Sequence, residues 1–122
     1  MAKEHLIAVV DDDDSFRASL VELLDSSAYG VRDFASAEAF VASGEADSFG
    51  CVITDIHMPG MSGIELKRLL VSRQCQVPVI MITARADPGL EDRVVSSGAV
   101  CLLRKPFEAD DLIGCLERVL KS

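Results

Sequence analysis

Five short apolar runs, each followed by a segment with helical spacing, constrain the fold of this 122-residue chain more than any other feature. The runs are His5–Val10, Tyr29–Phe34, Phe49–Thr54, Val77–Thr83 and Val100–Arg104. Strands that alternate with helices are joined by crossover connections, which place the strands parallel and the helices on both faces of the sheet. The sequence therefore predicts an α/β fold with a doubly wound, five-stranded parallel sheet.

Capping residues mark the starts of two of the intervening helices. Ser62 and Glu65 have the spacing of a capping box, and Asp87-Pro88 has the composition of an N-cap followed by a first helical residue. The connections from strand to helix are short, so the carboxyl ends of the strands should meet at one edge of the sheet. Open α/β sheets bind their ligands at that edge.

Charge and hydropathy exclude two classes of partner for this segment. Twelve Lys and Arg against twenty Asp and Glu give a net charge of −8, which is unsuited to displacing counterions from nucleic acid. No apolar run approaches the roughly 20 residues that a bilayer requires. We therefore expect one folded domain over residues 1–122 that contacts neither a membrane nor, by itself, nucleic acid.

Four cysteines occur without a C-x-x-C pair or a histidine at metal-binding distance along the chain. They are Cys51, Cys75, Cys101 and Cys115. This usage is typical of reduced thiols in the core of a cytoplasmic protein, and it argues against zinc or a disulfide. The sequence thus predicts four free cysteines and a cytoplasmic location.

Carboxylates follow two of the predicted strands. Asp11 to Asp14 come directly after the first strand, and one or two of them can be explained as helix caps or as a solvated acidic loop. Asp55 ends the third strand, and if the two strands are neighbours it lies beside Asp11 and Asp12. Three close carboxylates require a cation or a proton, and oxygen ligands suit a hard ion such as Mg²⁺.

The remaining two strands end in groups that can hold an anion. Thr83-Ala84 offers a hydroxyl and a backbone N–H, and Lys105 follows the fifth strand. Taken alone, a threonine at a strand end and a solvated lysine are common. At one sheet edge, opposite three carboxylates, they indicate a site for a cation and a phosphoryl group.

The chain resembles the receiver domains of two-component response regulators over essentially its whole length. The motifs that carry the resemblance are Val-Val-Asp-Asp-Asp-Asp-Ser-Phe-Arg, Thr-Asp-Ile-His-Met-Pro-Gly-Met-Ser-Gly, Ile-Thr-Ala and Arg-Lys-Pro-Phe, at residues 9–17, 54–63, 82–84 and 104–107. They are most similar to the FixJ-like, nitrogen-fixation branch of the family. The resemblance implies the flavodoxin-like (βα)5 architecture with strand order 2-1-3-4-5.

The resemblance also implies the metal ligands. Asp12 would bind Mg²⁺ directly and Asp11 through water, while Asp55 and the backbone carbonyl of His57 complete the protein's ligands. Mn²⁺ would fit the same oxygen donors.

The same family pattern implies that Asp55 is the phosphoacceptor and that a sensor histidine kinase is the donor. Thr83, Lys105 and the Ala84 N–H would hold the phosphoryl oxygens. The expected output is a conformational change or formation of a homodimer. No enzyme activity is expected beyond self-phosphorylation and slow dephosphorylation.

Two positions near the fifth strand carry further expectations. The family usually has an aromatic switch residue three positions before the lysine, and Leu102 stands there, so signalling should depend on loop movement instead. The family pattern also implies a cis peptide bond between Lys105 and Pro106, although only about 5% of X–Pro bonds in folded proteins are cis.

Other functions remain as alternatives. A phosphatase of the haloacid dehalogenase type would need a second acid where His57 stands, and a flavin binder would not place four aspartates where the phosphate must lie. Within the receiver interpretation, the chain is either a stand-alone phosphoryl carrier or the receiver part of a transcription factor. In the second case an output domain beyond residue 122 would contact the DNA.

Overall fold

A computed structural model describes residues 5–85 and 87–121 and contains one five-stranded parallel sheet with the order β2-β1-β3-β4-β5. The strands are β1 (Leu6–Val10), β2 (Gly30–Phe34), β3 (Cys51–Asp55), β4 (Val79–Thr83) and β5 (Cys101–Arg104). All pairings are parallel. The predicted fold class and strand order are confirmed, and the strand bounds differ from the prediction by at most two residues.

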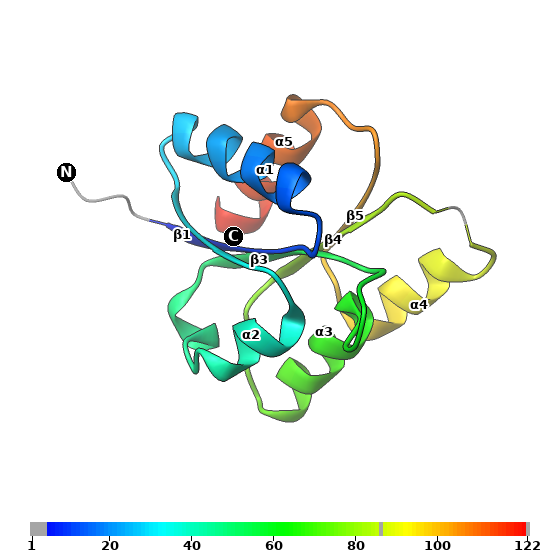
Figure 1. Cartoon of the computed structure of the whole chain (residues 1–122). Helices are drawn as coiled ribbons and strands as arrows, with labels where there is room; N and C mark the ends of the chain where they lie inside the picture. The colour runs from blue at the N-terminus through cyan, green and yellow to red at the C-terminus, as the bar shows by residue number, and fades with distance from the viewer. Residues whose placement is uncertain (1–4, 86, 122) are drawn as a thin grey trace.

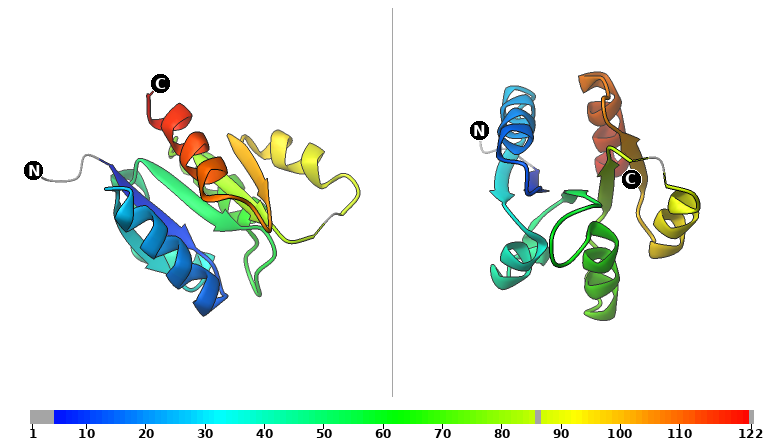
Figure 2. Two further views of the ribbon diagram at one scale, coloured as in Figure 1. Left: turned by 90° about the horizontal axis from the view of Figure 1, so that it is seen from above. Right: turned by 45° about the vertical axis from the view of Figure 1, so that its right-hand side comes forward.

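Helices cover both faces of this sheet (Figure 1). They are α1 (Asp14–Ser26), α2 (Ala37–Ala42), α3 (Gly63–Ser72), α4 (Leu90–Ser97) and α5 (Ala109–Lys121), with a short 3₁₀ helix η1 at Ala46–Ser48. Two further views show α1 and α5 on one side of the sheet and α2, α3 and α4 on the other (Figure 2). None of the described helices is long and apolar enough to cross a membrane.

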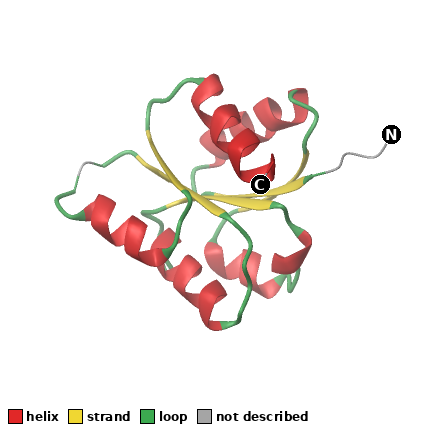
Figure 3. Ribbon diagram, turned by 180° about the vertical axis from the view of Figure 1, so that it is seen from behind, coloured by secondary structure: helices red, strands yellow, loops and turns green. Residues whose placement is uncertain are grey.

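The central strand β3 and its neighbour β4 are buried from end to end. Every residue of β3 and β4 is buried, which explains why both strands are nearly continuous apolar runs in the sequence. One core packs beneath α1 and α5 and the other beneath α2, α3 and α4, on opposite faces of the twisted sheet (Figure 3). The sheet is therefore held rigidly, and the polar ends of its strands are placed with it.

Helix starts follow the predicted chemistry at α3 but not at α4. The Ser62 hydroxyl accepts from Glu65 N and the Glu65 carboxylate accepts from Ser62 N, so the capping box is present. The predicted cap at Asp87 is wrong, because α4 begins after Gly89, whose φ of +75° is readily adopted by glycine. The Asp87 carboxylate instead lies 3.4 Å from His57 Nε2.

The prediction of four free cysteines is also wrong. Cys101 and Cys115 form a disulfide, with Cα atoms 6.8 Å apart, while Cys51 and Cys75 are free and buried. The physical reason is the packing of α5 against β5, which brings two residues 14 positions apart into contact. Cysteine spacing alone contains no information about that packing.

Candidate functional site

Strand register brings the two strand-end carboxylates together. Val10 of β1 is paired with Thr54 of β3, so the next residues, Asp11 and Asp55, lie side by side where the strands end. One carboxylate oxygen from each of Asp11, Asp12 and Asp55 lies within 4.8 Å of the others. The structure thus assembles the carboxylate cluster that the sequence predicts.

Asp11 is the buried member of this cluster. Its side chain is 1% exposed, and its Oδ1 accepts a hydrogen bond of 2.8 Å from Asp13 N. Its Oδ2 is buried without a hydrogen-bond partner among the described residues. Burial raises the pKa of Asp11 above its ordinary value, and the Asp13 N–H and the Lys105 ammonium only partly oppose this rise. A buried carboxylate oxygen that accepts no hydrogen bond costs stability, and a nearby cation reduces that cost.

Lys105 provides the cation that faces the cluster. Its Nζ lies 3.5 Å from Asp55 Oδ2 and 3.7 Å from Asp11 Oδ2. The same ammonium lies 3.9 Å from the centre of the Phe16 ring, so a cation–π contact helps to aim it. The Lys105–Pro106 peptide bond is cis, as expected.

Thr83 and Ala84 stand at the same edge, but the threonine hydroxyl is engaged in its own loop. Lys105 N donates to Thr83 O at 2.7 Å, which joins the ends of β4 and β5. Thr83 Oγ1 accepts from Arg85 N at 3.0 Å and donates to Arg85 O at 3.1 Å. Thr83 is fully buried, whereas Ala84 is exposed. The proposed contacts of the Thr83 hydroxyl and the Ala84 N–H with phosphoryl oxygens stay predictions.

The loop after β3 packs tightly around Asp55. His57 N donates to Asp55 Oδ1 at 3.3 Å, while the role of the His57 carbonyl as a metal ligand stays a prediction. A Cβ at Gly63 would lie 2.5 Å from the Asp55 carbonyl oxygen, so only glycine allows α3 to begin so close to the site. This requirement was not predicted from the sequence.

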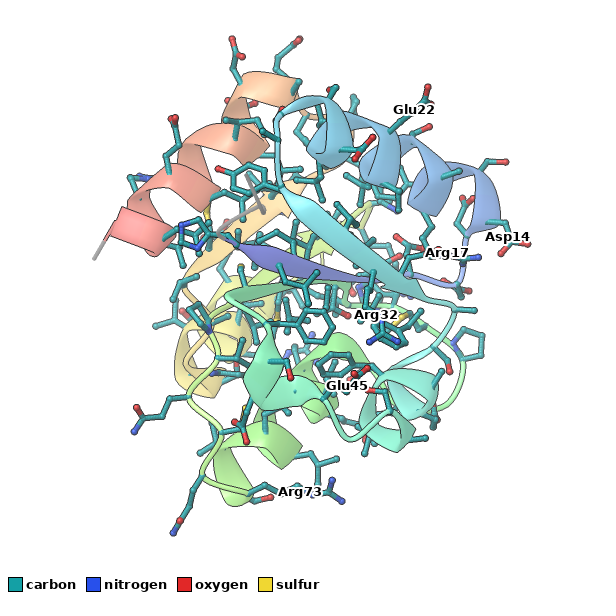
Figure 4. The ribbon with its side chains drawn as sticks, turned by 90° about the vertical axis from the view of Figure 1, so that its left-hand side faces the viewer. Asp14, Arg17, Glu22, Arg32, Glu45 and Arg73 are labelled. Carbon is teal, nitrogen blue, oxygen red and sulfur yellow. A yellow bond between two sulfur atoms is a disulfide. The ribbon has the colours of Figure 1, made fainter. Side chains whose placement is uncertain are left out.

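Arg17 is a second group that the sequence analysis missed. Its Nη1 donates to Asp11 O at 2.7 Å, its Nη2 to Asp14 Oδ1 at 2.8 Å and its Nε to Asp33 Oδ2 at 2.9 Å. Figure 4 shows Arg17 beside Asp14 at the start of α1. This guanidinium ties the loop that carries Asp11 to the end of β2. The helical spacing of Asp14 and Arg17 could have signalled one of these three bonds.

Glu38 of α2 holds the other side of the loop after β3. Its Oε2 accepts from Met61 N at 2.9 Å, and this hydrogen bond lowers the pKa of Glu38. The same carboxylate lies against Gly60, whose φ is +77°. The loop that carries His57 is thus anchored from a separate helix, which sequence spacing could not show.

A substitution at Asp11 tests the electrostatic account of the metal-free cluster. Because burial raises the pKa of Asp11, protonation of this group stabilises the folded protein at low pH, and that contribution is lost as the pH rises through the raised pKa. At neutral pH we expect Asp11→Asn to increase the free energy of unfolding by about 1 kcal/mol without divalent cations.

Urea unfolding at neutral and mildly acidic pH measures this effect. The advantage of the Asp11→Asn variant should shrink as the pH falls, because protonation neutralises the wild-type carboxyl group as well. A variant that is less stable than the wild type at neutral pH would contradict a net destabilising effect of burying the charged Asp11 carboxylate.

Fold and site together define a class of protein: a doubly wound α/β domain with three carboxylates and a lysine at the carboxyl edge of its sheet. The Response regulator receiver domain family matches residues 7–117. The chain belongs to this family, and it is a receiver domain of the two-component type.

Individual relatives agree with the family assignment. The chain is 41% identical over 116 residues to the transcriptional regulatory protein FixJ of Bradyrhizobium diazoefficiens, covering 95% of this chain and 57% of that protein. The FixJ-N crystal structure superposes with a TM-score of 0.88 at 35% identity, covering 97% of this chain and 94% of that one.

Full-length FixJ from B. japonicum gives a TM-score of 0.89 at 39% identity, covering 98% of this chain but 59% of that one. The chain therefore spans little more than half the length of the full-length regulators it matches. It corresponds to the receiver part of those proteins.

Proposed function

We propose that Asp55 accepts a phosphoryl group and that residues 1–122 act as the receiver unit of a transcriptional regulator. One observation supports this most strongly: Asp55 lies beside the carboxylates of Asp11 and Asp12, and the ammonium of Lys105 lies 3.5 Å from its Oδ2. A carboxylate that attacks an anionic phosphoryl group needs nearby positive charge to reduce the repulsion between the two.

The residues of the carboxylate cluster fit a hard divalent cation. Oδ2 of Asp11 is a buried oxygen that accepts no hydrogen bond from the described residues and that a metal ion would satisfy, and carboxylate oxygens are the donors that Mg²⁺ and Mn²⁺ prefer. Asp11, Asp12, Asp55 and the His57 carbonyl would hold the ion. When bound, Mg²⁺ would neutralise charge on the attacking carboxylate and on the phosphoryl oxygens.

The chain's own groups carry out the remaining chemistry. A carboxylate oxygen of Asp55 attacks the phosphorus of a phosphohistidine or a small acyl phosphate, forming the acyl phosphate while the bond from phosphorus to the donor breaks. Lys105 would hold one phosphoryl oxygen, and Thr83 and the Ala84 N–H would hold others after the Thr83 hydroxyl leaves Arg85. Hydrolysis of this acyl phosphate would be the only other reaction.

The proposed partners follow from the relatives. FixJ is described as a transcriptional regulatory protein, which favours an output domain that binds DNA over a stand-alone phosphoryl carrier. A sensor histidine kinase is the proposed donor and a phosphorylation-dependent homodimer the proposed output. The net charge of −8 supports DNA contact through the output domain only.

Phosphoryl uptake from a small acyl phosphate tests the proposed function. Intact-mass measurement should show one phosphoryl group added in the presence of Mg²⁺ and none after chelation. The Asp55→Asn variant should stay unlabelled under both conditions, because an amide cannot act as the nucleophile. Labelling of Asp55→Asn at the wild-type level would contradict the assignment.

Leu102 of β5 tests how the switch works without an aromatic ring. Leu102 is half-buried and packs against the core beneath α2, α3 and α4. We expect Leu102→Ala to lower the free energy of unfolding by about 1–2 kcal/mol, less than a fully buried leucine would. Phosphoryl-dependent dimerisation, measured by light scattering, should persist. Its loss in a folded variant would make Leu102 a switch residue.

A further inference from the structure

The disulfide between Cys101 and Cys115 joins an edge strand to a helix across the proposed site's lysine loop. Cys101 begins the edge strand β5, which pairs with β4, and Cys115 lies in α5. The cross-link closes a loop with a sequence separation of 14 that contains Lys105. Its sulfurs take no part in the phosphoryl chemistry proposed above.

The two cysteines of the disulfide differ in exposure. Both cysteines line a groove with Pro78, Arg118 and Val119, but Cys101 is half-buried, whereas Cys115 is only 3% exposed and belongs to the core beneath α1 and α5. An external thiol can therefore approach the sulfur of Cys101 more easily than that of Cys115.

A guanidinium stands next to the buried sulfur. Arg118 Nη2 donates to Cys115 Sγ at 3.4 Å, and Arg118 lines the same groove. A cation beside a thiol favours the thiolate, and a sulfur that is stable as a thiolate is the better leaving group in thiol–disulfide exchange. Access and charge thus both favour attack at Cys101 with departure of Cys115.

The geometry points to a reversible thiol–disulfide site, which we propose reacts with low-molecular-weight thiols and disulfides of the glutathione class. In the reducing direction, a glutathione thiolate attacks Cys101, and Cys115 leaves as a thiolate. A second glutathione then attacks the sulfur of the first glutathione in the mixed disulfide. This step releases the Cys101 thiol and oxidised glutathione. Two electrons pass from two glutathiones to the protein disulfide, and the reverse sequence re-forms it.

The two other cysteines do not compete for this reaction. Cys51 is fully buried in β3, and burial raises the pKa of its thiol to about 12. Burial also raises the pKa of the Cys75 thiol, which is 6% exposed. A buried thiol with a raised pKa is a poor nucleophile, so exchange should be confined to Cys101 and Cys115.

Equilibration of the whole chain in anaerobic glutathione buffers tests the proposal. After acid quenching and alkylation, peptide mapping should show Cys101 and Cys115 changing together, reversibly, with the ratio of reduced to oxidised glutathione. Cys51 and Cys75 should be alkylated only after denaturation. Opening the cross-link should lower the melting temperature by roughly 10 °C, the size expected for a closed loop of this length.

Three variants make the outcome specific. Cys115→Ser should leave Cys101 able to take one glutathione as a mixed disulfide, and the double variant Cys51→Ser, Cys75→Ser should behave like the wild type. Arg118→Gln should slow reduction several-fold, and an unchanged rate would contradict departure of the Cys115 thiolate.

Two results would overturn the proposal itself. In the first, both thiols stay alkylatable in oxidised glutathione alone. In the second, the disulfide survives excess reduced glutathione until the protein unfolds. Neither result bears on phosphoryl uptake by Asp55.

Discussion

Replacing Lys105 with glutamine should slow phosphoryl uptake from a small acyl phosphate by about 100-fold, the usual cost of removing one group that stabilises developing charge. The ammonium lies 3.5 Å from Asp55 Oδ2, where it can offset the negative charge of the incoming phosphoryl oxygens. The amide of glutamine keeps a hydrogen-bond donor but loses the charge. A stopped assay followed by intact-mass measurement gives the rate.

The neighbouring Arg104 is the matched control for this substitution. Its guanidinium is exposed and pairs with Glu91 of α4, which is not part of the carboxylate cluster. Arg104→Gln removes the same charge from the adjacent position and should leave the rate within a factor of about two, as for surface charges in general. Equal rates in wild type and Lys105→Gln would show that Lys105 does not act in the transfer.

Mg²⁺ should raise the melting temperature of the wild-type protein because it binds the folded carboxylate cluster and not the unfolded chain. At a hundredfold excess over Kd this linkage is worth about 2.7 kcal/mol, or roughly 10 °C for a domain of this size. Asp12→Asn should lose most of the shift. Asp12 is exposed, so its replacement should leave the fold intact.

Generic charge effects must be separated from binding, since the protein carries a net charge of −8. Sodium chloride at matched ionic strength controls for screening, and Asp92→Asn removes one exposed carboxylate of α4 that lies outside the cluster. Asp92→Asn should retain the full Mg²⁺ shift. A shift that sodium chloride reproduces, or that Asp12→Asn retains, would contradict the cation site.

The strands and the polar residues at their ends could be predicted from local patterns, whereas the strand order that makes β1 and β3 neighbours was implied by the family resemblance. Apolar runs locate the strands, and the residue that follows each run must lie at the carboxyl edge of a parallel sheet. Asp11, Asp55 and Lys105 meet for that reason, and register places Asp11 beside Asp55.

The supporting contacts could not be predicted because they join residues that are distant in sequence. The bonds from Arg17 to Asp33 and from Met61 N to Glu38 depend on how helices sit against the sheet. The disulfide depends likewise on how α5 turns against β5.

The error at Asp87 has a different cause. A carboxylate before proline is a common helix start, but here it lies against His57 and leaves the cap to a glycine.

Chemical identification of the labelled residue tests the central claim most directly. Borohydride reduces an acyl phosphate of aspartate to homoserine, which marks the attachment point permanently. After incubation with a small acyl phosphate and Mg²⁺, reduction and peptide sequencing should place homoserine at position 55 and nowhere else. Homoserine at position 11 or 12, or a stable phosphoryl group on a serine, threonine or histidine, would contradict the proposed role of Asp55.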